Sequence, residues 1–198
     1  MKYPDFFNDL PSITLQDELS EFLGTFANGI VEFSYLDIVK SAGHSCPTVL
    51  GAYLSCINGL NALFGEDVPK RGQIFISFKE HENEGVAGVI ANVYTQITGA
   101  TKTSGFKGIA GNFVRHSLMD FGANISSDVK ITRLDTNKSV EVVYNPNLVP
   151  GSPKQMELMQ KIIQNRATDD EKIEFGQLWQ QRVEDIFLHQ DKCLRVKL

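Results

Sequence analysis

The stretch that decides the fold is residues 47–65, PTVLGAYLSCINGLNALFG, in which apolar residues occupy most faces of a helix. Proline is tolerated in the first turn of a helix because its missing N–H would have no partner there, and glycine commonly follows a helix end. A helix that is apolar nearly all round is buried. The sequence therefore predicts a buried helix that begins at Pro47 and ends before Gly65.

The segments downstream of this helix predict a sheet and a second buried helix. In residues 73–79 apolar and other residues alternate, as in a strand. Residues 85–99 are rich in Ala, Val and Ile, too long for a strand and stopped by glycine, so a helix is expected. Residues 129–134 and 139–144 flank the turn residues 135–138 and form a hairpin. The expected core is α+β, with a mixed or antiparallel sheet packed with two buried helices.

Both ends of the chain carry further elements. Residues 14–23 place apolar side chains on one side and predict a short amphipathic helix, and residues 29–36 predict a strand. The loop at 145–152 is the one clear boundary, and it divides a core domain, 1–150, from an extension, 151–198. In this extension we expect an αα-hairpin that packs on the core or on the partner in a dimer.

The two helices of this hairpin have their own start signals. One begins at Pro153, and the other follows Thr168 and Glu171, which have the spacing of a capping box. The second helix carries an apolar stripe that needs a partner, and its members are Phe175, Leu178, Trp179, Val183, Ile186 and Phe187.

Composition excludes several classes of protein. The 198 residues hold 19 Lys+Arg against 24 Asp+Glu, a net charge of −5, so nucleic acid is not expected as a partner. No run of about 18 apolar residues predicts a membrane span. No secretory signal is visible, and three scattered cysteines build no disulfide framework. We therefore expect a cytoplasmic protein.

The motif Gly43-His-Ser-Cys-Pro47 is the strongest candidate for chemistry. Cys46 falls beside the start of the buried helix, where free N–H groups and the helix dipole favour a thiolate. His44, two residues earlier, could serve as a second metal ligand or as a proton acceptor. The plain alternative is a buried cysteine beside a loop histidine with satisfied hydrogen bonds.

Other polar residues are weaker candidates. Glu80 and His81 follow the predicted strand at 73–79 and could bind a ligand or a metal; the alternative is a solvated charge run. Thr98, Thr101 and Asn112 lie in or beside a glycine-rich loop that could hold a small ligand. The remaining residues of interest are expected to be ordinary: His116 beside an exposed Arg115, Cys56 in the core, His189 near the C-terminus and Cys193 in the tail.

Three of these motifs resemble the FmdE family, which takes its name from one of the subunits of formylmethanofuran dehydrogenase. Residues 43–51 are similar to its Gly-His-x-Cys-Pro-Gly-x-x-x-Gly signature, and residues 88–101 to its Cys-x-x-Asp-Ala-Ile-Gln helix and Thr-Gly-Cys-Thr turn. Gly111-Asn112 resembles the end of its Gly-Lys-Gly-Asn element. The resemblance covers roughly residues 35–188 and the order of elements. It implies a core-domain member without the C-terminal zinc finger, in a tightly intertwined homodimer.

The sequence also departs from that family at four positions. Thr48 stands where the family has glycine, Val89 and Ala100 where it has cysteine, and Asn92 where it has aspartate. Two thiols and a carboxylate of the implied site are therefore missing.

Three hypotheses for function remain open. The first is a metal-binding homodimer in which His44, Cys46 and His81 hold a divalent ion, with zinc favoured by the ligand types and with an open position for water or a small ligand. The second is a metal-free enzyme with Cys46 as nucleophile and with Thr98, Thr101 or Asn112 on the substrate. The third is a module that binds a small molecule or cofactor, or that assembles with a metalloenzyme.

Overall fold

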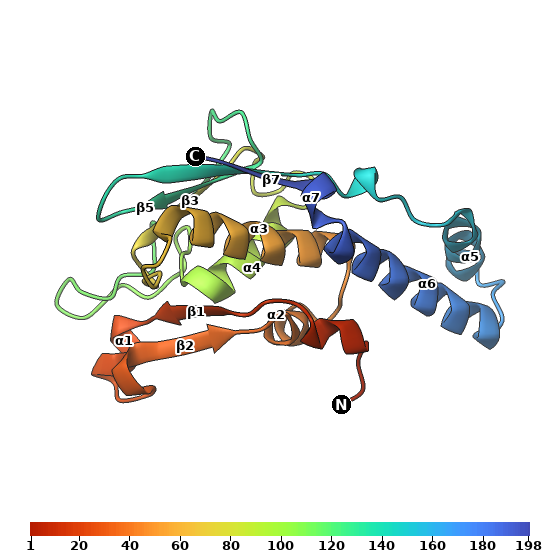
Figure 1. The fold of residues 1–198 in the computed structure, drawn as a ribbon, viewed down its shortest axis with the longest axis horizontal. Coiled ribbons are helices and arrows are strands. Elements are labelled where there is room, and N and C mark those ends of the chain that lie inside the picture. The colour runs from red at the N-terminus through yellow and green to blue at the C-terminus, as the bar shows by residue number, and fades with distance from the viewer.

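A computed structural model describes residues 1–198 as three layers. Helices α3 (Pro47–Phe64) and α4 (Ala87–Thr98) form the middle layer, and a five-stranded sheet covers one side of it. The hairpin of β1 (Ile13–Gln16) and β2 (Ile30–Phe33) lies on the other side (Figure 1). The fold is α+β, as the sequence predicts.

The large sheet is mixed. Its strand order is β4-β3-β5-β6-β7, with bounds Met119–Phe121, Ile74–Phe78, Val129–Arg133, Ser139–Tyr144 and Leu194–Lys197. Only β3 and β4 run parallel; the other neighbours pair antiparallel. The predicted hairpin over residues 129–144 is confirmed, with Val129 opposite Val142 and Ile131 opposite Val140. These apolar pairs are buried against the helices, because alternate strand residues share one face.

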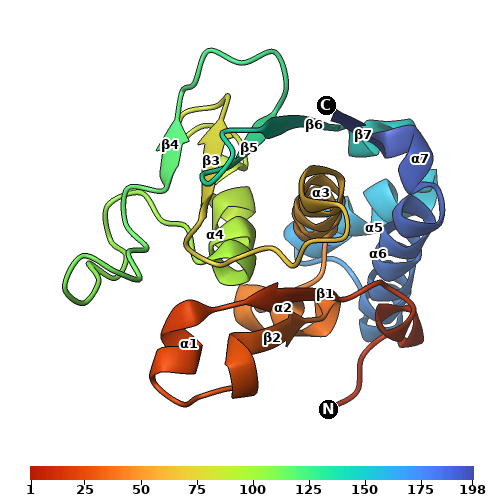
Figure 2. The same ribbon diagram turned by 60° about the vertical axis from the view of Figure 1, so that its left-hand side comes forward.

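Helix α3 is the centre of the core, as its sequence predicts. Its N-cap is Cys46, Pro47 is its first residue, and Gly65 closes it with a positive φ. Figure 2 looks nearly along α3 and shows it between α4, α6, the sheet and the β1–β2 hairpin. Most of its side chains are buried, and Cys56 among them is fully so.

The C-terminal extension is a helical hairpin followed by a strand. Helices α5 (Pro153–Ile163) and α6 (Asp169–Leu188) pack together, and Thr168 and Glu171 form the predicted capping box. Val183 and Ile186 of α6 are buried in the main core. The short helix α7 (Gln190–Cys193) leads into β7, which pairs with β6 and so returns the chain to the core sheet.

The remaining elements are short. They are η1 (Asp5–Asn8), α1 (Glu18–Phe22), η2 (Ala27–Gly29), α2 (Tyr35–Ala42) and η3 (Pro146–Leu148). None of the helices of the protein combines the length and the apolar character needed to cross a membrane.

The predicted amphipathic helix over residues 14–23 is wrong in its first half. Residues Ile13–Gln16 are strand β1, whose alternating Ile13 and Leu15 are buried while its backbone pairs with β2. Asp17 then ends the strand and caps α1, because its Oδ1 accepts hydrogen bonds from the N–H groups of Leu19 and Ser20.

Candidate functional site

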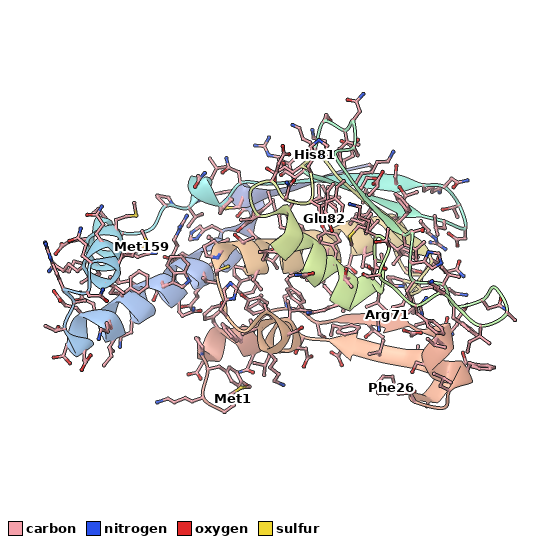
Figure 3. All side chains as sticks on the ribbon, turned by 180° about the vertical axis from the view of Figure 1, so that it is seen from behind. Met1, Phe26, Arg71, His81, Glu82 and Met159 are labelled. Atoms are coloured by element: carbon pink, nitrogen blue, oxygen red, sulfur yellow. The ribbon has the colours of Figure 1, made fainter.

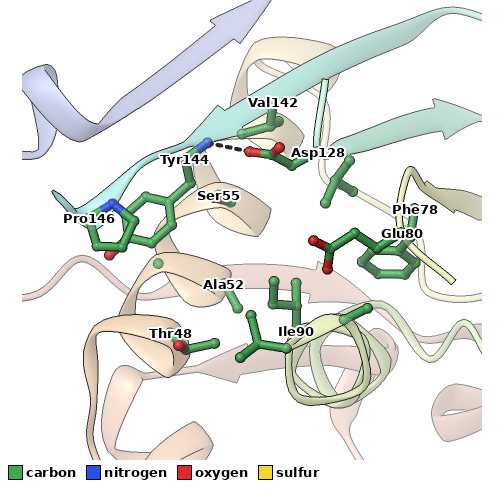
Figure 4. A pocket seen from close by; sticks show the side chains of 14 residues that line it. Thr48, Ala52, Ser55, Phe78, Glu80, Ile90, Asp128, Val142, Tyr144 and Pro146 are labelled. Atoms are coloured by element: carbon green, nitrogen blue, oxygen red, sulfur yellow. Dashed lines mark hydrogen bonds between the residues drawn. The ribbon is translucent and has the colours of Figure 1, made fainter. Parts of the chain in front are cut away.

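A mostly apolar cavity of about 190 Å³ lies between α3, the first turn of α4 and the sheet (Figure 4). Its wall is mostly apolar, with hydroxyl groups and two carboxylates among the apolar side chains. The residues that line it are Thr48, Gly51, Ala52, Ser55, Phe78, Glu80, Val86, Ala87, Ile90, Asp128, Val129, Val142, Tyr144 and Pro146. Several separate segments of the chain therefore contribute to one site.

Gly51 of α3 makes room for the side chain of Tyr144, which forms one end of the cavity. A Cβ on Gly51 would overlap the ring of Tyr144, so the ring lies directly across the helix backbone at this glycine. The Tyr144 hydroxyl donates to the carbonyl of Pro47 at 2.8 Å, which fixes the ring at one end of the cavity. Burial raises the pKa of this phenol well above its usual value, an effect that Arg182 partly opposes. Tyr144 thus remains a neutral wall residue near neutral pH.

Two carboxylates face the cavity from the ends of neighbouring strands. Glu80 follows β3 and Asp128 precedes β5, and both residues line the hollow. Figure 4 shows the Asp128 carboxylate turned toward the Tyr144 N–H. An Asp128 oxygen, Oδ2, accepts a hydrogen bond from the Tyr144 N–H at 2.8 Å, which holds the carboxylate in place. Glu80 Oε2 lies 3.0 Å from the point where a Cβ on Gly85 would stand, so the carboxylate packs on the backbone that leads into α4.

A buried phenol lies near the cavity in the core. The Tyr94 hydroxyl on α4 is fully buried and has no hydrogen-bond partner. Burial raises its pKa well above the usual value, and the charges of Cys56 and Asp128 contribute in the same direction. Tyr94 is therefore a neutral, unpaired donor within the electrostatic reach of Asp128.

The two residues of the His-x-Cys motif point to different places. Cys46 packs against the core as the N-cap of α3, and its Sγ accepts the Val49 N–H at 3.4 Å. His44 is exposed, with Nδ1 3.1 Å from the carbonyl oxygen of Ala42. Ser45 between them is buried and fixes the backbone of this segment. Its carbonyl accepts hydrogen bonds from Trp179 Nε1 and Gln180 Nε2 of α6.

His44 borders a second, more open hollow between the end of α2 and α4. The other residues that line it are Ser41, Ala42, Val89, Asn92, Val93, Thr95 and Gln96. His44 therefore faces Val89 and Asn92, two of the positions at which the sequence departs from the family that it resembles. Neither side chain is a thiolate or a carboxylate.

His81 lies apart from His44 and from Cys46. It follows β3 at the sheet edge (Figure 3), and its ring packs so closely on Gly122 that a Cβ there would overlap it. No three His, Cys, Asp or Glu side chains in the protein form a group that could hold a metal ion. Within one chain, the residues present therefore do not provide the three or four ligands of a zinc site.

The other predicted ligand-binding residues lie away from the cavity, except Glu80. Thr98 is fully buried, and its hydroxyl donates to the Tyr94 carbonyl at 2.7 Å. The hydroxyl of Thr101 donates to the Arg115 carbonyl at 2.9 Å. Asn112 is exposed in the loop after α4, where its backbone pairs with Ile109. Both hydroxyls thus serve internal hydrogen bonds of the protein.

Two predictions about ordinary residues are wrong. Arg115, expected to be exposed, is buried, and its guanidinium binds the Asp17 carboxylate at 2.7 Å. Cys193, expected as a tail thiol, is buried in the main core at the end of α7. Both residues are buried against segments that lie far away in the sequence, and no local pattern indicates this.

Sequence reasoning missed Asp128 and Tyr144 as lining residues. Asp128 directly precedes a predicted strand, and Tyr144 ends the next one, so both positions are strand ends like that of Glu80. The available signal was the hairpin register, which places Val129 opposite Val142 and so brings Asp128, one residue before Val129, near Tyr144, two residues after Val142.

Comparisons with known proteins add no assignment. No protein-family model matches the chain, and no curated protein is significantly similar to it in sequence.

Proposed function

We propose that the protein binds a small organic molecule in the cavity between α3, α4 and the sheet. The observation that carries this proposal is the cavity itself, which combines a mostly apolar wall with two carboxylates. Ligand sites are typically concave and mostly apolar, with a few polar groups that fix the orientation of the ligand. This is the small-molecule form of the binding-module hypothesis, and Glu80 is the predicted residue that takes part in it.

The size of the cavity limits the ligand. An apolar cavity of about 150 Å³ in another protein holds one benzene molecule, and the cavity here measures about 190 Å³. A compound with one ring, or a short alkyl chain, therefore fits without a change in the backbone.

The test uses a set of single-ring compounds and a variant with a filled cavity. Ala52→Leu places a larger side chain in the cavity, and Ala62→Leu makes the same change at an exposed position of the same helix. We expect compounds that raise the melting temperature of the wild type and of Ala62→Leu, but not that of Ala52→Leu. The proposal falls if no compound binds the wild type, or if Ala52→Leu binds equally well.

Metal binding by an FmdE-like homodimer is the second candidate. The observation that favours it is the hollow that His44 lines together with Val89 and Asn92 of α4. At these two positions the FmdE family carries a thiol and a carboxylate. In this proposal a second copy of the chain supplies the missing ligands to a zinc-like ion.

Elemental mass spectrometry and light scattering test this second candidate together. We expect a dimer with a stoichiometric metal that is lost in His44→Ala and retained in the control His189→Ala, since His189 is also exposed but lies at the end of α6. A metal-free wild type, or a metal that His44→Ala retains, would reject it.

A further inference from the structure

We infer that the cavity selects a small organic cation, namely a primary or secondary amine attached to an apolar body of about one ring. This inference rests on the proposed function and specifies the class of ligand. It depends on the charges and apolar surfaces that face the cavity from each surrounding element.

All the charge in the wall is negative. Glu80 comes from the end of β3 and Asp128 from the start of β5, while α3 and α4 contribute only neutral residues. Neither carboxylate takes part in an ion pair in the structure. An ammonium group beside them would gain charge-assisted hydrogen bonds, and a carboxylate or phosphate would be repelled.

The basic residues near the cavity are turned away or already bound. Lys79 and Lys130 each adjoin lining residues of a strand, and alternate side chains of a strand point to opposite faces. Arg182 lies beyond the Pro146 end, where Nε donates to the Val149 carbonyl at 3.3 Å and Nη2 to the Pro146 carbonyl at 3.4 Å. No base is therefore placed to neutralise Glu80 or Asp128 in the cavity.

Apolar side chains of the sheet and of the helices accept the apolar body. Phe78 and Val142 of the sheet face Ala52 of α3 and Ile90 of α4 across the hollow (Figure 4), and Val129 of the sheet also lines it. A ring placed between these side chains lies close to both carboxylates, since Glu80 is two residues from Phe78 and Asp128 directly precedes Val129. The arrangement thus joins apolar surface with two negative charges and no positive one, which matches an amphipathic amine.

Three probes of the same shape and different charge test this inference: benzylamine, benzyl alcohol and benzoate, each titrated by calorimetry near neutral pH. We expect benzylamine to bind about tenfold more tightly than benzyl alcohol, because a hydrogen bond to a charged group is roughly twice as strong as one between neutral groups. Benzoate should not bind. Added salt should weaken the binding of benzylamine and leave the binding of benzyl alcohol unchanged.

Glu80→Gln and Asp128→Asn remove one charge each at nearly constant shape, and the amide oxygen that Asp128→Asn introduces can still accept the Tyr144 N–H. We expect each variant to lower benzylamine affinity about tenfold and to leave benzyl alcohol unaffected, as measured by the same titration. Glu174→Gln, at an exposed position of α6, is the matched control and should bind benzylamine as the wild type does.

The outcomes separate the two proposals. If benzyl alcohol or benzoate binds as tightly as benzylamine, or if both charge variants bind benzylamine like the wild type, the amine inference is wrong while small-molecule binding stands. If none of the three probes binds, the amine inference is wrong; if no compound of the single-ring set binds either, both proposals fall.

Discussion

Replacing Asp17 by asparagine tests whether a buried ion cluster holds the N-terminal hairpin on the core. Asp17 is 8% exposed and Arg115 9% exposed. The Arg115 guanidinium donates to one Asp17 oxygen at 2.7 Å, and that of Arg71 lies 3.3 Å from the other oxygen. One carboxylate thus faces two cations. Burial lowers the pKa of Arg71, and the charge of Arg115 adds to that effect while Asp17 opposes it.

The size of the effect follows from what the substitution leaves behind. Asparagine keeps an oxygen that can accept the N–H groups of Leu19 and Ser20, so the cap of α1 survives. Buried Arg115 and half-buried Arg71, however, lose their counterion. Breaking a buried pair in this way costs about 3 to 5 kcal/mol. For a chain of this length that lowers the melting temperature by about 6 to 20 °C.

Urea and thermal denaturation followed by circular dichroism measure this loss. Asp9→Asn, at an exposed position without an ion pair, is the control and should stay within about 0.5 kcal/mol of the wild type. Asp17→Ala should lose about a further 1 kcal/mol, because it also removes the helix cap. An Asp17→Asn protein within about 1 kcal/mol of the wild type would refute the argument, since it would show that solvent already compensates the two arginines.

Three further predictions concern the core. Gly51→Ala should lower stability by about 1 to 3 kcal/mol in urea, because the new Cβ overlaps the Tyr144 ring; a Tyr144→Leu background should reduce this loss, and an equal loss there would contradict the explanation. Maleimide labelling followed by mass spectrometry should modify half-buried Cys46 first, since the other two cysteines are buried; earlier labelling of either would contradict the structure. Raising the pH above about 10 should destabilise the fold, because burial raises the pKa of four phenols above the unfolded value and their stabilisation is full only below that value. The four phenols are those of Tyr35, Tyr53, Tyr94 and Tyr144. Absorbance at about 295 nm should show that they ionise together with unfolding and not before it.

Local patterns sufficed for the elements whose own residues determine them. Helix α3 is apolar on most faces and bounded by Pro47 and Gly65, and α6 begins at a capping box, so both follow from neighbours in the sequence. The β5–β6 hairpin likewise depends on alternation and a local turn. Residues 14–23 failed because their apolar spacing suits either a helix or a strand, and only pairing with β2 decides between them.

The candidate site was harder to predict because its parts meet only in three dimensions. Glu80 was found from its place at a strand end, but Asp128 and Tyr144 required the strand register. His44 and Cys46 are close in the sequence yet point apart, because Cys46 is extended at φ −153° as the N-cap of α3 and turns its sulfur to the Val49 N–H. Close spacing therefore did not produce a shared site.

Helix α4 separates the two candidate functions in space and makes them independent in experiment. Val86, Ala87 and Ile90 face the cavity with the carboxylates, whereas Val89, Asn92 and Gln96 face the hollow of His44. A substitution such as Glu80→Gln therefore changes charge on one side of the helix without touching the other. If an amine and a metal both bind, and if Glu80→Gln weakens only the amine while His44→Ala removes only the metal, the chain carries two sites on different faces of α4. If His44→Ala also weakens the amine, α4 couples them, because it is the only element that lines both hollows.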